Sequence, residues 1–181
     1  MNHVISGRVI KLDRDNIDTD VIAPAYWLRL GAGEKHLETL LPHAFEAIRP
    51  DLPSFVQPGD VFVVGRNFGA GSHREQAVQI LQLWGVQAIV AESLARIYFR
   101  NAIGAGLPAF NLAGVTELFE EGEQIEIDME RWRVSNPGHG EHRDLSPFPP
   151  TVMRILEAGG IPALVKDRIE RQLSVKAGRP E

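Results

Sequence analysis

The sequence predicts an α/β fold that contains parallel sheet. In the middle of the chain, apolar strand-like runs alternate with helical segments of about ten residues. The strand-like runs cover Val61–Val64, 86–91 and 107–112, and the helical segments between them cover 75–84 and 94–103. Because two parallel strands need a crossover connection, usually a helix, this alternation indicates consecutive βαβ units.

The N-terminal third predicts one further strand and short helices. Val4–Leu12 alternates apolar and polar residues as a strand does, and we expect Gly7 to form a bulge in it. Residues 13–25 are polar and then contain proline, which indicates a loop. Residues 34–48 predict one or two short amphipathic helices divided by a proline, and a proline-rich connection follows over residues 50–59.

The C-terminal third predicts a β-hairpin followed by two helices. Gln124–Asp128 and residues 131–135 have the alternation of hairpin strands. Residues 136–150 are rich in Gly, Pro and His and indicate a loop. Helices are expected over residues 151–158, which end at a glycine pair, and over residues 161–173, which a frayed tail follows.

The composition indicates a soluble, cytoplasmic protein with one main domain. Its 181 residues can bury a sizeable core, and 44% hydrophobic and 24% charged residues are ordinary proportions. A net charge of −5 argues against nucleic acid as the main partner. We expect no signal peptide and no membrane segment, because no apolar run approaches the roughly 18 residues that a membrane helix requires. The chain has no cysteine, which excludes disulfides and thiolate metal ligands.

The segment most informative about function is 65–77, Gly-Arg-Asn-Phe-Gly-Ala-Gly-Ser-His-Arg-Glu-Gln-Ala. Its glycines allow a sharp turn after a strand, and Ser72 and Arg74 are expected in the first turn of the helix that follows. A helix start favours anions, and a guanidinium binds a carboxylate with two hydrogen bonds. The segment therefore indicates a site for an acidic small molecule with a hydroxyl group beside it.

The residues alone also allow a structural interpretation of this segment, and they exclude three known motifs. Ser72 and Glu75 have the spacing of a capping box, so a purely structural role for Ser72 is about as probable on spacing as a functional one. Three nucleotide and nucleophile motifs do not fit. Arg74 stands where a dinucleotide fingerprint and a nucleophile elbow require glycine, and no Gly-Lys-Ser/Thr follows for a P-loop.

Three segments in order resemble the swivelling domain of the aconitase family. The first is 65–77, with the pattern Gly-x-Asn-x-Gly-x-Gly-Ser-x-Arg-Glu-x-Ala. The second is 16–24, Asn-Ile-Asp-Thr-Asp-x-Ile-x-Pro, and the third is 91–101, Ala-x-Ser-x-Ala-Arg-Ile-x-Phe-Arg-Asn. The resemblance covers about residues 5–165. In this family, the stand-alone form of the swivelling domain is the small subunit of 3-isopropylmalate dehydratase and homoaconitase.

The resemblance implies a three-layer β/β/α swivelling domain over residues 1–165, with residues 166–181 as a helix end and flexible tail. It implies a hydro-lyase that dehydrates and rehydrates a hydroxy di- or tricarboxylic acid. A separate large subunit would carry a [4Fe–4S] cluster, and this chain would bind no cofactor. The 3-isopropylmalate type of leucine biosynthesis ranks first, and a homoaconitase-like or other hydroxy-diacid type is the alternative. A non-catalytic anion-binding module of the same fold is the rival from another class.

The resemblance also assigns residues to roles. Ser72 matches the catalytic base, with its pKa expected to be lowered by the helix start and nearby cations. Arg74 matches the arginine that binds a substrate carboxylate, and Asp20 matches an acid of the site loop whose structural alternative is an Asx-turn. His73 replaces a second serine, so it either contacts the substrate or points away. Arg29, in the segment that sets substrate choice, either binds a second carboxylate or faces solvent.

Other polar residues were judged weaker candidates. His139 and His142 have a spacing seen at metal sites, but the loop offers no third ligand, and no metal site is expected. Arg96 and Arg100 lie four residues apart on one predicted helix. They could bind an anion, but a structural or subunit-interface role is at least as probable.

Overall fold

A computed structural model of the chain describes residues 3–30 and 36–176. The centre of the fold is a seven-stranded sheet in the order β4-β3-β2-β1-β5-β6-β7. Strands β1 to β4 are parallel, and β5 to β7 continue the sheet in antiparallel fashion. The strand bounds are β1 Val4–Leu12, β2 Val61–Val64, β3 Ala88–Ala91, β4 Ala109–Asn111, β5 Gln124–Asp128, β6 Arg133–Asn136 and β7 Glu141–Asp144.

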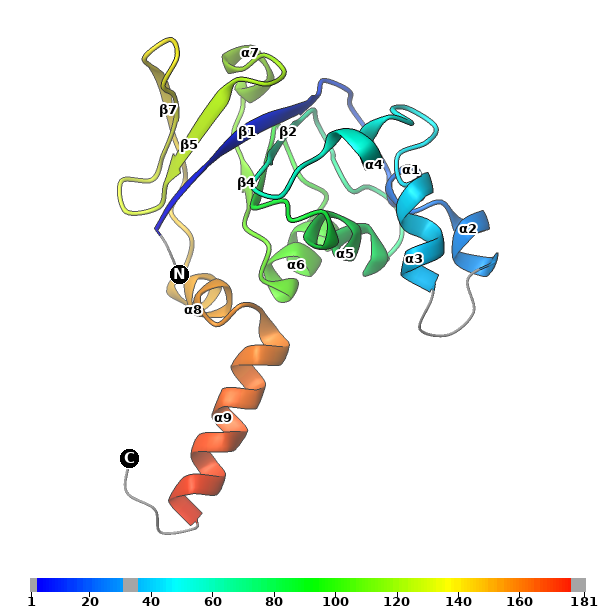
Figure 1. The fold of residues 1–181 in the computed structure, drawn as a ribbon. Helices are drawn as coiled ribbons and strands as arrows, with labels where there is room; N and C mark the ends of the chain where they lie inside the picture. Colours follow the sequence, from blue (N-terminus) through cyan, green and yellow to red (C-terminus); the bar gives the residue numbers. More distant parts are fainter. Residues whose placement is uncertain (1–2, 31–35, 177–181) are drawn as a thin grey trace.

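Helices cover the parallel half of the sheet and also lie at its ends (Figure 1). The two crossover helices are α5 Gln76–Leu83 and α6 Arg96–Ala105. Near the N-terminus lie α1 Thr19–Ile22, α2 Ala25–Leu30, α3 His36–Leu40, the 3₁₀ turn Leu41–His43 and α4 Leu52–Phe55. The remaining helices are α7 Val115–Leu118, α8 Pro150–Glu157 and α9 Ile161–Lys176, which stands away from the body of the domain.

Two hydrophobic clusters lie on opposite faces of the parallel strands. On β2, Phe62 and Val64 belong to the cluster that packs against α5 and α6, and the alternate residues Val61 and Val63 belong to the other. The second cluster includes Ile127 of β5, so the antiparallel half curls over the parallel half. Helices, parallel strands and antiparallel strands therefore form the three layers of the expected β/β/α fold.

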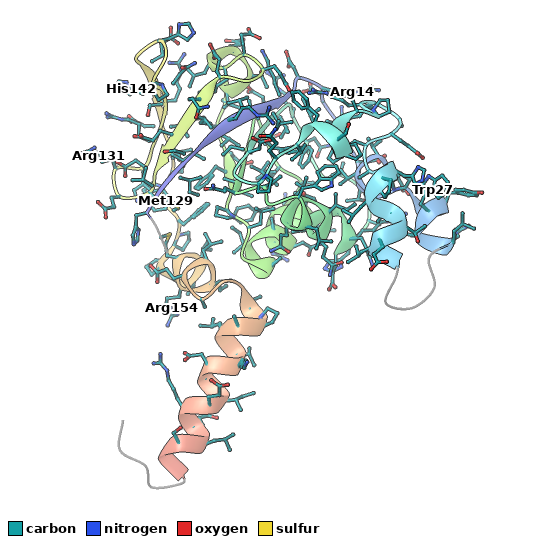
Figure 2. All side chains as sticks on the ribbon, in the orientation of Figure 1. Arg14, Trp27, Met129, Arg131, His142 and Arg154 are labelled. Carbon is teal, nitrogen blue, oxygen red and sulfur yellow. The ribbon has the colours of Figure 1, made fainter. Side chains whose placement is uncertain are left out.

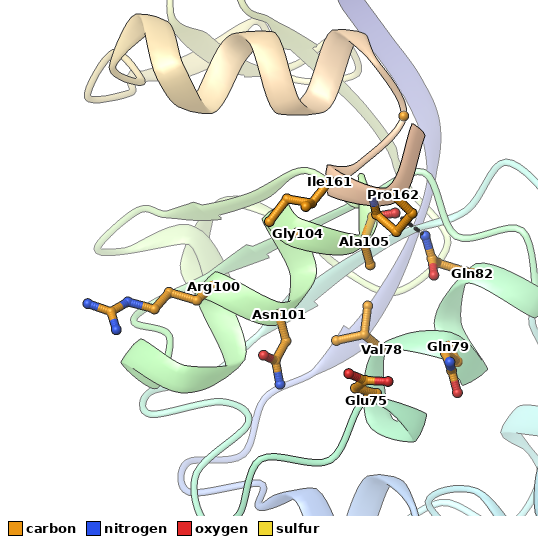
Figure 3. Close-up of a pocket in the computed structure, with 11 residues that line it drawn as sticks. Glu75, Val78, Gln79, Gln82, Arg100, Asn101, Gly104, Ala105, Ile161 and Pro162 are labelled. Atoms are coloured by element: carbon orange, nitrogen blue, oxygen red, sulfur yellow. Dashed lines mark hydrogen bonds between the residues drawn. The ribbon is translucent and has the colours of Figure 1, made fainter. Parts of the chain in front are cut away.

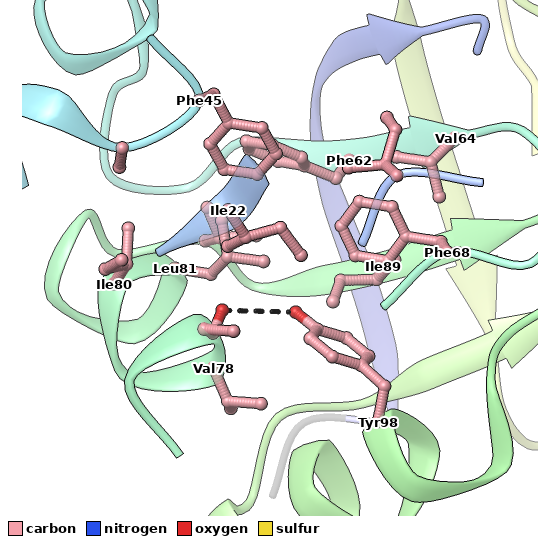
Figure 4. Close-up of a cluster of buried hydrophobic side chains, with 14 of the residues drawn as sticks. Ile22, Phe45, Phe62, Val64, Phe68, Val78, Ile80, Leu81, Ile89 and Tyr98 are labelled. Atoms are coloured by element: carbon pink, nitrogen blue, oxygen red, sulfur yellow. Dashed lines mark hydrogen bonds between the residues drawn. The ribbon is translucent and has the colours of Figure 1, made fainter. Parts of the chain in front are cut away.

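The helix-side cluster also fixes the start of the second βαβ unit (Figure 4). Tyr98 of α6 is fully buried and lies edge-on to Phe68, with ring centroids 5.1 Å apart. Its hydroxyl donates to the carbonyl of Ala77 at the start of α5, across 3.3 Å. Burial raises the pKa of Tyr98 far above its usual value. Tyr98 thus joins α5, α6 and the loop after β2.

Several local predictions were wrong. Gly7 forms no bulge, because β1 pairs with β5 without interruption from Val4 to Arg8. Glycine is required there because a Cβ at position 7 would collide with the carbonyl oxygen of Gly59. The predicted loops contain the short helices α1 and α4 and the edge strand β7, and α2 follows the first of these loops; the sequence pattern did not indicate any of these elements. The last helix continues to Lys176, beyond the predicted end at residue 173, and residues 177–181 lie outside the described range.

Candidate functional site

Two loops lie side by side at the carboxyl end of the parallel strands. The loop after β1 and the loop after β2 exchange backbone hydrogen bonds in parallel fashion. Asn16 donates to the carbonyl of Arg66 at 2.8 Å, and Gly69 donates to the carbonyl of Ile17 at 2.7 Å. The carboxyl edge of parallel strands is where open α/β sheets bind ligands. Two of the three segments that carry the family resemblance, 16–24 and 65–77, are therefore adjacent in space.

Glycine sets the path of the loop after β2. Gly69 has φ +76°, and a Cβ at this position would collide with the ring of Tyr98. Gly71 has φ +94°, and a Cβ there would lie 3.3 Å from Thr19 Oγ1. Both positions need the left-handed backbone that glycine adopts readily. The chain can therefore cross closely over α6 and then deliver Ser72 beside Thr19.

Ser72 is exposed, and Thr19 is its side-chain neighbour. Ser72 Oγ lies 3.3 Å from Thr19 Oγ1. The predicted capping box is wrong: α5 begins at Gln76, its N-cap is Glu75 in helical conformation, and no side chain caps it. An extra turn intervenes, because the N–H of Arg74 donates to the carbonyl of Ser72. Ser72 thus precedes the helix rather than lying in its first turn.

Arg74 is held by the short helix α1. Its Nη1 atom lies 2.6 Å from Asp20 Oδ1 and donates to the carbonyl of Ala23 at 2.8 Å. Within residues 3–30 and 36–176, no hydrogen bond to Nε or Nη2 of Arg74 is present. Among the residues that the structure describes, only Nη1 of the guanidinium has a partner. The edge formed by Nε and Nη2 has the geometry that a carboxylate binds with two hydrogen bonds.

His73 and Arg29 are both exposed, and neither side chain makes a hydrogen bond or ion pair with the described part of the chain. Arg29 lies in the last turn of α2, which Trp27 anchors. The Trp27 ring stacks on His43 with centroids 3.4 Å apart, and its Nε1 donates to Glu46. Since Arg29 follows Trp27 by two residues, the two side chains project from different faces of the helix. The structure brings together Ser72, Arg74 and Asp20, but it places no contact between them and Arg29.

Glu92 organises the neighbouring edge of the sheet, at the carboxyl end of β3. It accepts hydrogen bonds from the N–H groups of Gly114 and Thr116 and from the Thr116 hydroxyl, at 2.8 to 3.0 Å. Burial acts to raise the pKa of Glu92, but these hydrogen bonds and the charge of Arg66 outweigh burial and leave the pKa below its usual value. Glu92 is therefore a structural carboxylate that ties the β4–α7 connection to the site edge.

The weaker candidates do not join this site. His142 lies on β7, on the side of the molecule opposite Trp27 (Figure 2). His139 Nε2 lies 2.7 Å from Glu123 Oε1, which explains its place without a metal. Among residues 3–30 and 36–176, no three His, Asp or Glu side chains form a group that could hold a metal ion.

A groove of about 460 Å³ lies between α5, α6 and the start of α9 (Figure 3). Val78, Ala105 and Ile161 give it an apolar floor, and Gln82 of α5 donates to the carbonyl of Ala105 across one end. Arg100 extends away from the other labelled side chains. Polar side chains also line the groove, but Asp20, Ser72 and Arg74 are not among its lining residues, so it is separate from the site formed by the two loops.

Comparisons with known proteins agree with this arrangement. The Aconitase C-terminal domain family matches residues 50–113. A 3-isopropylmalate dehydratase small subunit from Halothermothrix orenii is 40% identical over 166 residues, which cover 92% of this chain and 98% of that protein. The chain belongs to the 3-isopropylmalate dehydratase small-subunit family of aconitase-like proteins. Its relatives are subunits of hydro-lyases, and small-subunit names imply a complex with a large subunit.

Two further relatives place this family membership in context. A methanogen homoaconitase small subunit from Methanothermobacter thermautotrophicus is 42% identical over 161 residues, covering 89% of this chain and 90% of that protein. The crystal structure of a 3-isopropylmalate dehydratase (leuD) from Methanocaldococcus jannaschii matches with a TM-score of 0.84 and 33% identity, over 94% of this chain and 98% of that one. The expected fold is confirmed. In the described residues, no helix is long and apolar enough to cross a membrane.

Proposed function

We propose that this chain is the small subunit of a two-chain hydro-lyase whose substrate is 3-isopropylmalate. The observation that carries the proposal is that Ser72 and Arg74 both contact the α1 segment, Ser72 through Thr19 and Arg74 through Asp20 and Ala23, while Nε and Nη2 of Arg74 make no hydrogen bond with the described residues. Four of the matching relatives are named as 3-isopropylmalate dehydratase small subunits. The residues that resemble the family's site thus occur with a geometry that suits a hydroxy acid.

Ser72 is proposed as the base of the reaction. As an alkoxide, Ser72 Oγ accepts the proton from the carbon next to a substrate carboxylate. The electron pair of that C–H bond becomes the C=C bond as hydroxide leaves the neighbouring carbon, and water adds back with the opposite regiochemistry. Arg74 holds the carboxylate through Nε and Nη2, which fixes the orientation of the C–H bond toward Ser72.

Asp20 is proposed to act through Arg74. An Asp carboxylate repels a substrate carboxylate, so direct contact between the two is unfavourable. The 2.6 Å ion pair with Nη1 would instead fix the orientation of the guanidinium, whose Nε and Nη2 make no hydrogen bond with the described residues. His73 remains a proposed substrate contact, since its exposed side chain lies between Ser72 and Arg74 in the chain.

Any [4Fe–4S] cluster would be held by the large subunit. Such clusters are bound by cysteine thiolates, and this chain has no cysteine. The cluster would provide Lewis-acid chemistry toward the departing hydroxyl. The small subunit would provide the base, the carboxylate-binding cation and part of the enclosure that excludes water.

A second assignment, to a homoaconitase-like substrate with an additional carboxylate, also has support. Arg29 is an exposed cation on α2 with no partner among the described residues, and a substrate with an additional carboxylate would provide one. An isopropyl group would instead need apolar walls. A homoaconitase-like relative matches this chain at an identity similar to that of the isopropylmalate type. Arg29 is therefore the residue on which the alternative depends.

The test is reconstitution of the complex under anaerobic conditions with the large subunit from the same organism. Formation of the unsaturated acid is followed by ultraviolet absorbance with 3-isopropylmalate, citramalate and homocitrate-type acids. Ser72→Ala is expected to remove activity while the complex still forms, and Ser54→Ala, an exposed serine on α4, serves as the matched control. Full activity of Ser72→Ala would contradict the proposal. A strong preference for the additional carboxylate, lost in Arg29→Ala, would select the homoaconitase-like assignment.

A further inference from the structure

Thr19 is a buried hydroxyl side chain in direct contact with the proposed base. Its exposed fraction is 2%, although the neighbouring Asp20 and Ser72 are exposed. It is the first residue of α1, its N–H donates to the carbonyl of Ala70 at 2.8 Å, and its carbonyl accepts from the N–H of Ala23. Backbone hydrogen bonds on both sides therefore hold Thr19 in place against the loop that carries Ser72.

The Thr19 hydroxyl has two acceptors within reach and one proton to donate. Thr19 Oγ1 lies 3.3 Å from the backbone oxygen of Ser72 and 3.3 Å from Ser72 Oγ. Both distances exceed the roughly 2.7 to 2.8 Å of a strong O–H···O hydrogen bond. In the neutral state both hydrogen bonds are weak, and either hydroxyl can be the donor between the two Oγ atoms. A negative charge on Ser72 Oγ would make Thr19 the donor, because an alkoxide only accepts and a charge-assisted hydrogen bond is shorter and about twice as strong.

No other described group provides this stabilisation. Within residues 3–30 and 36–176, Thr19 is the one hydrogen-bond partner of Ser72 Oγ. The N–H groups at the start of α5 are too far along the chain, since that helix begins at Gln76 and the N–H of Arg74 is used by the backbone oxygen of Ser72. The sequence predicted that the helix start would lower the pKa of Ser72. The start of α5 makes no hydrogen bond to Ser72 Oγ, so it does not act in that way.

We infer that the Thr19 hydroxyl stabilises the alkoxide form of Ser72 and so determines the pH range in which the base acts. This inference rests on the proposed role of Ser72 as the base. The Thr19 proton turns from the Ser72 carbonyl to Ser72 Oγ when that oxygen is charged. It turns back when Ser72 Oγ has accepted the substrate proton. Gly71 permits the approach, because any Cβ at that position would lie 3.3 Å from Thr19 Oγ1.

The decisive variants are Thr19→Val, which keeps the shape and removes the hydroxyl, and Thr19→Ser, which keeps the hydroxyl. In the reconstituted complex, Thr19→Val is expected to lower kcat about 10- to 100-fold, the loss of one charge-assisted hydrogen bond, with KM changed less than about threefold. The acidic limb of the kcat–pH profile should move to higher pH, because the alkoxide is harder to form. Thr19→Ser should restore most of kcat and the original limb.

The outcomes separate this inference from the proposed function. An unshifted pH limb in Thr19→Val, or a Thr19→Ser variant as slow as Thr19→Val, would overturn the role of the hydroxyl while Ser72→Ala remains inactive. Full activity in Ser72→Ala would instead refute the proposed base itself. If Thr19→Val does not assemble with the large subunit, Thr19→Ala is measured in the same way. Urea unfolding of each variant shows whether the fold is intact.

Discussion

Arg74 Nη1 lies 2.6 Å from Asp20 Oδ1, so two residues that are each candidates for substrate binding bind one another. The pair joins the loop after β2 to the first turn of α1. Asp20 is 59% exposed and Arg74 is 20% exposed, so the pair faces solvent on the carboxylate side. It is therefore suited to orienting a guanidinium more than to holding the fold together.

Asp20→Asn should separate these two roles. The free energy of unfolding is expected to fall by less than about 1 kcal/mol, because exposed ion pairs contribute little. Activity of the reconstituted complex should fall about tenfold in kcat/KM, because Arg74 loses the contact that orients it. Asp167→Asn, which breaks the exposed Arg171–Asp167 pair on α9, is the matched control and should change neither quantity. Equal activity in the two variants would rule out an orienting role for Asp20.

Gly69→Ala is expected to destabilise the domain by about 2 to 4 kcal/mol. The variant adds left-handed backbone strain to a collision with the Tyr98 ring. Gly122→Ala is the control, since Gly122 also has a positive φ but has nothing within 4 Å of an added Cβ. It should cost about 1 kcal/mol, from strain alone. Urea denaturation measures both, and equal losses would mean that the contact with Tyr98 is unimportant.

Glu92→Gln should weaken the domain near neutral pH by about 1 to 3 kcal/mol, because an ionised acceptor of three hydrogen bonds becomes neutral. The pKa of Glu92 is lowered in the folded chain, so its contribution is present above its unfolded pKa and is lost as pH falls through the folded pKa. The difference between wild type and variant should therefore shrink in acid. Glu117→Gln, an exposed neighbour, should show no such trend in unfolding measured from pH 7 to pH 3.

Because of Tyr98, we expect the domain to lose stability at alkaline pH. Its pKa is raised in the folded chain, so stabilisation by the neutral ring is complete below the unfolded pKa of about 10 and declines as pH rises above it. Tyr98→Phe should lower the free energy of unfolding by about 1 kcal/mol at neutral pH, through the lost bond to Ala77. It should also flatten the alkaline decline. A decline of equal slope in the variant would assign the effect to other groups.

The proposed boundary at residue 165 can be tested by truncation. Beyond it, Ile169 and Leu173 are 50% and 60% exposed, so a chain that ends at Val165 should unfold within about 1 kcal/mol of the full chain. A chain that ends at Ala158 should be markedly less stable, because it lacks Gly160, which is buried against Gly104 and Ala105. Thermal unfolding of the three chains decides this, and a large loss on the first truncation would move the boundary toward the C-terminus.

The core of the fold could be predicted because buried strands consist of runs of apolar residues that are visible in the sequence. β2 and β3 are buried at every position, and their apolar runs predicted them to within two residues. β7 has four exposed residues and is held by backbone pairing to β6, so it leaves no hydrophobic pattern. The short helix α1 has a local N-cap, since Asp18 accepts from the N–H of Val21, but its four residues are too few for a helical pattern to show in the sequence.

The site was predictable only in part. Residue types and family resemblance pointed to Ser72, Arg74 and Asp20, but more than fifty residues separate Asp20 from the other two, and periodicity cannot place them together. The capping box, which the spacing of Ser72 and Glu75 left open as a structural alternative, does not form because the chain makes one more turn before α5. Thr19 was not among the candidate site residues that the sequence indicated. Its burial, which distinguishes it from the acids on either side, is a tertiary property.

The central position of β1 has a consequence for the order in which the chain can assemble. Val9 pairs with Val61, and Ile5 pairs with Ile127, so β1 is synthesised well before either of its partner strands. During translation one edge of β1 stays open until most of the polypeptide has left the ribosome. Open strand edges invite association with other chains, and distant pairings slow folding. The N-terminal strand is therefore the segment that a chaperone would most need to protect in the nascent protein.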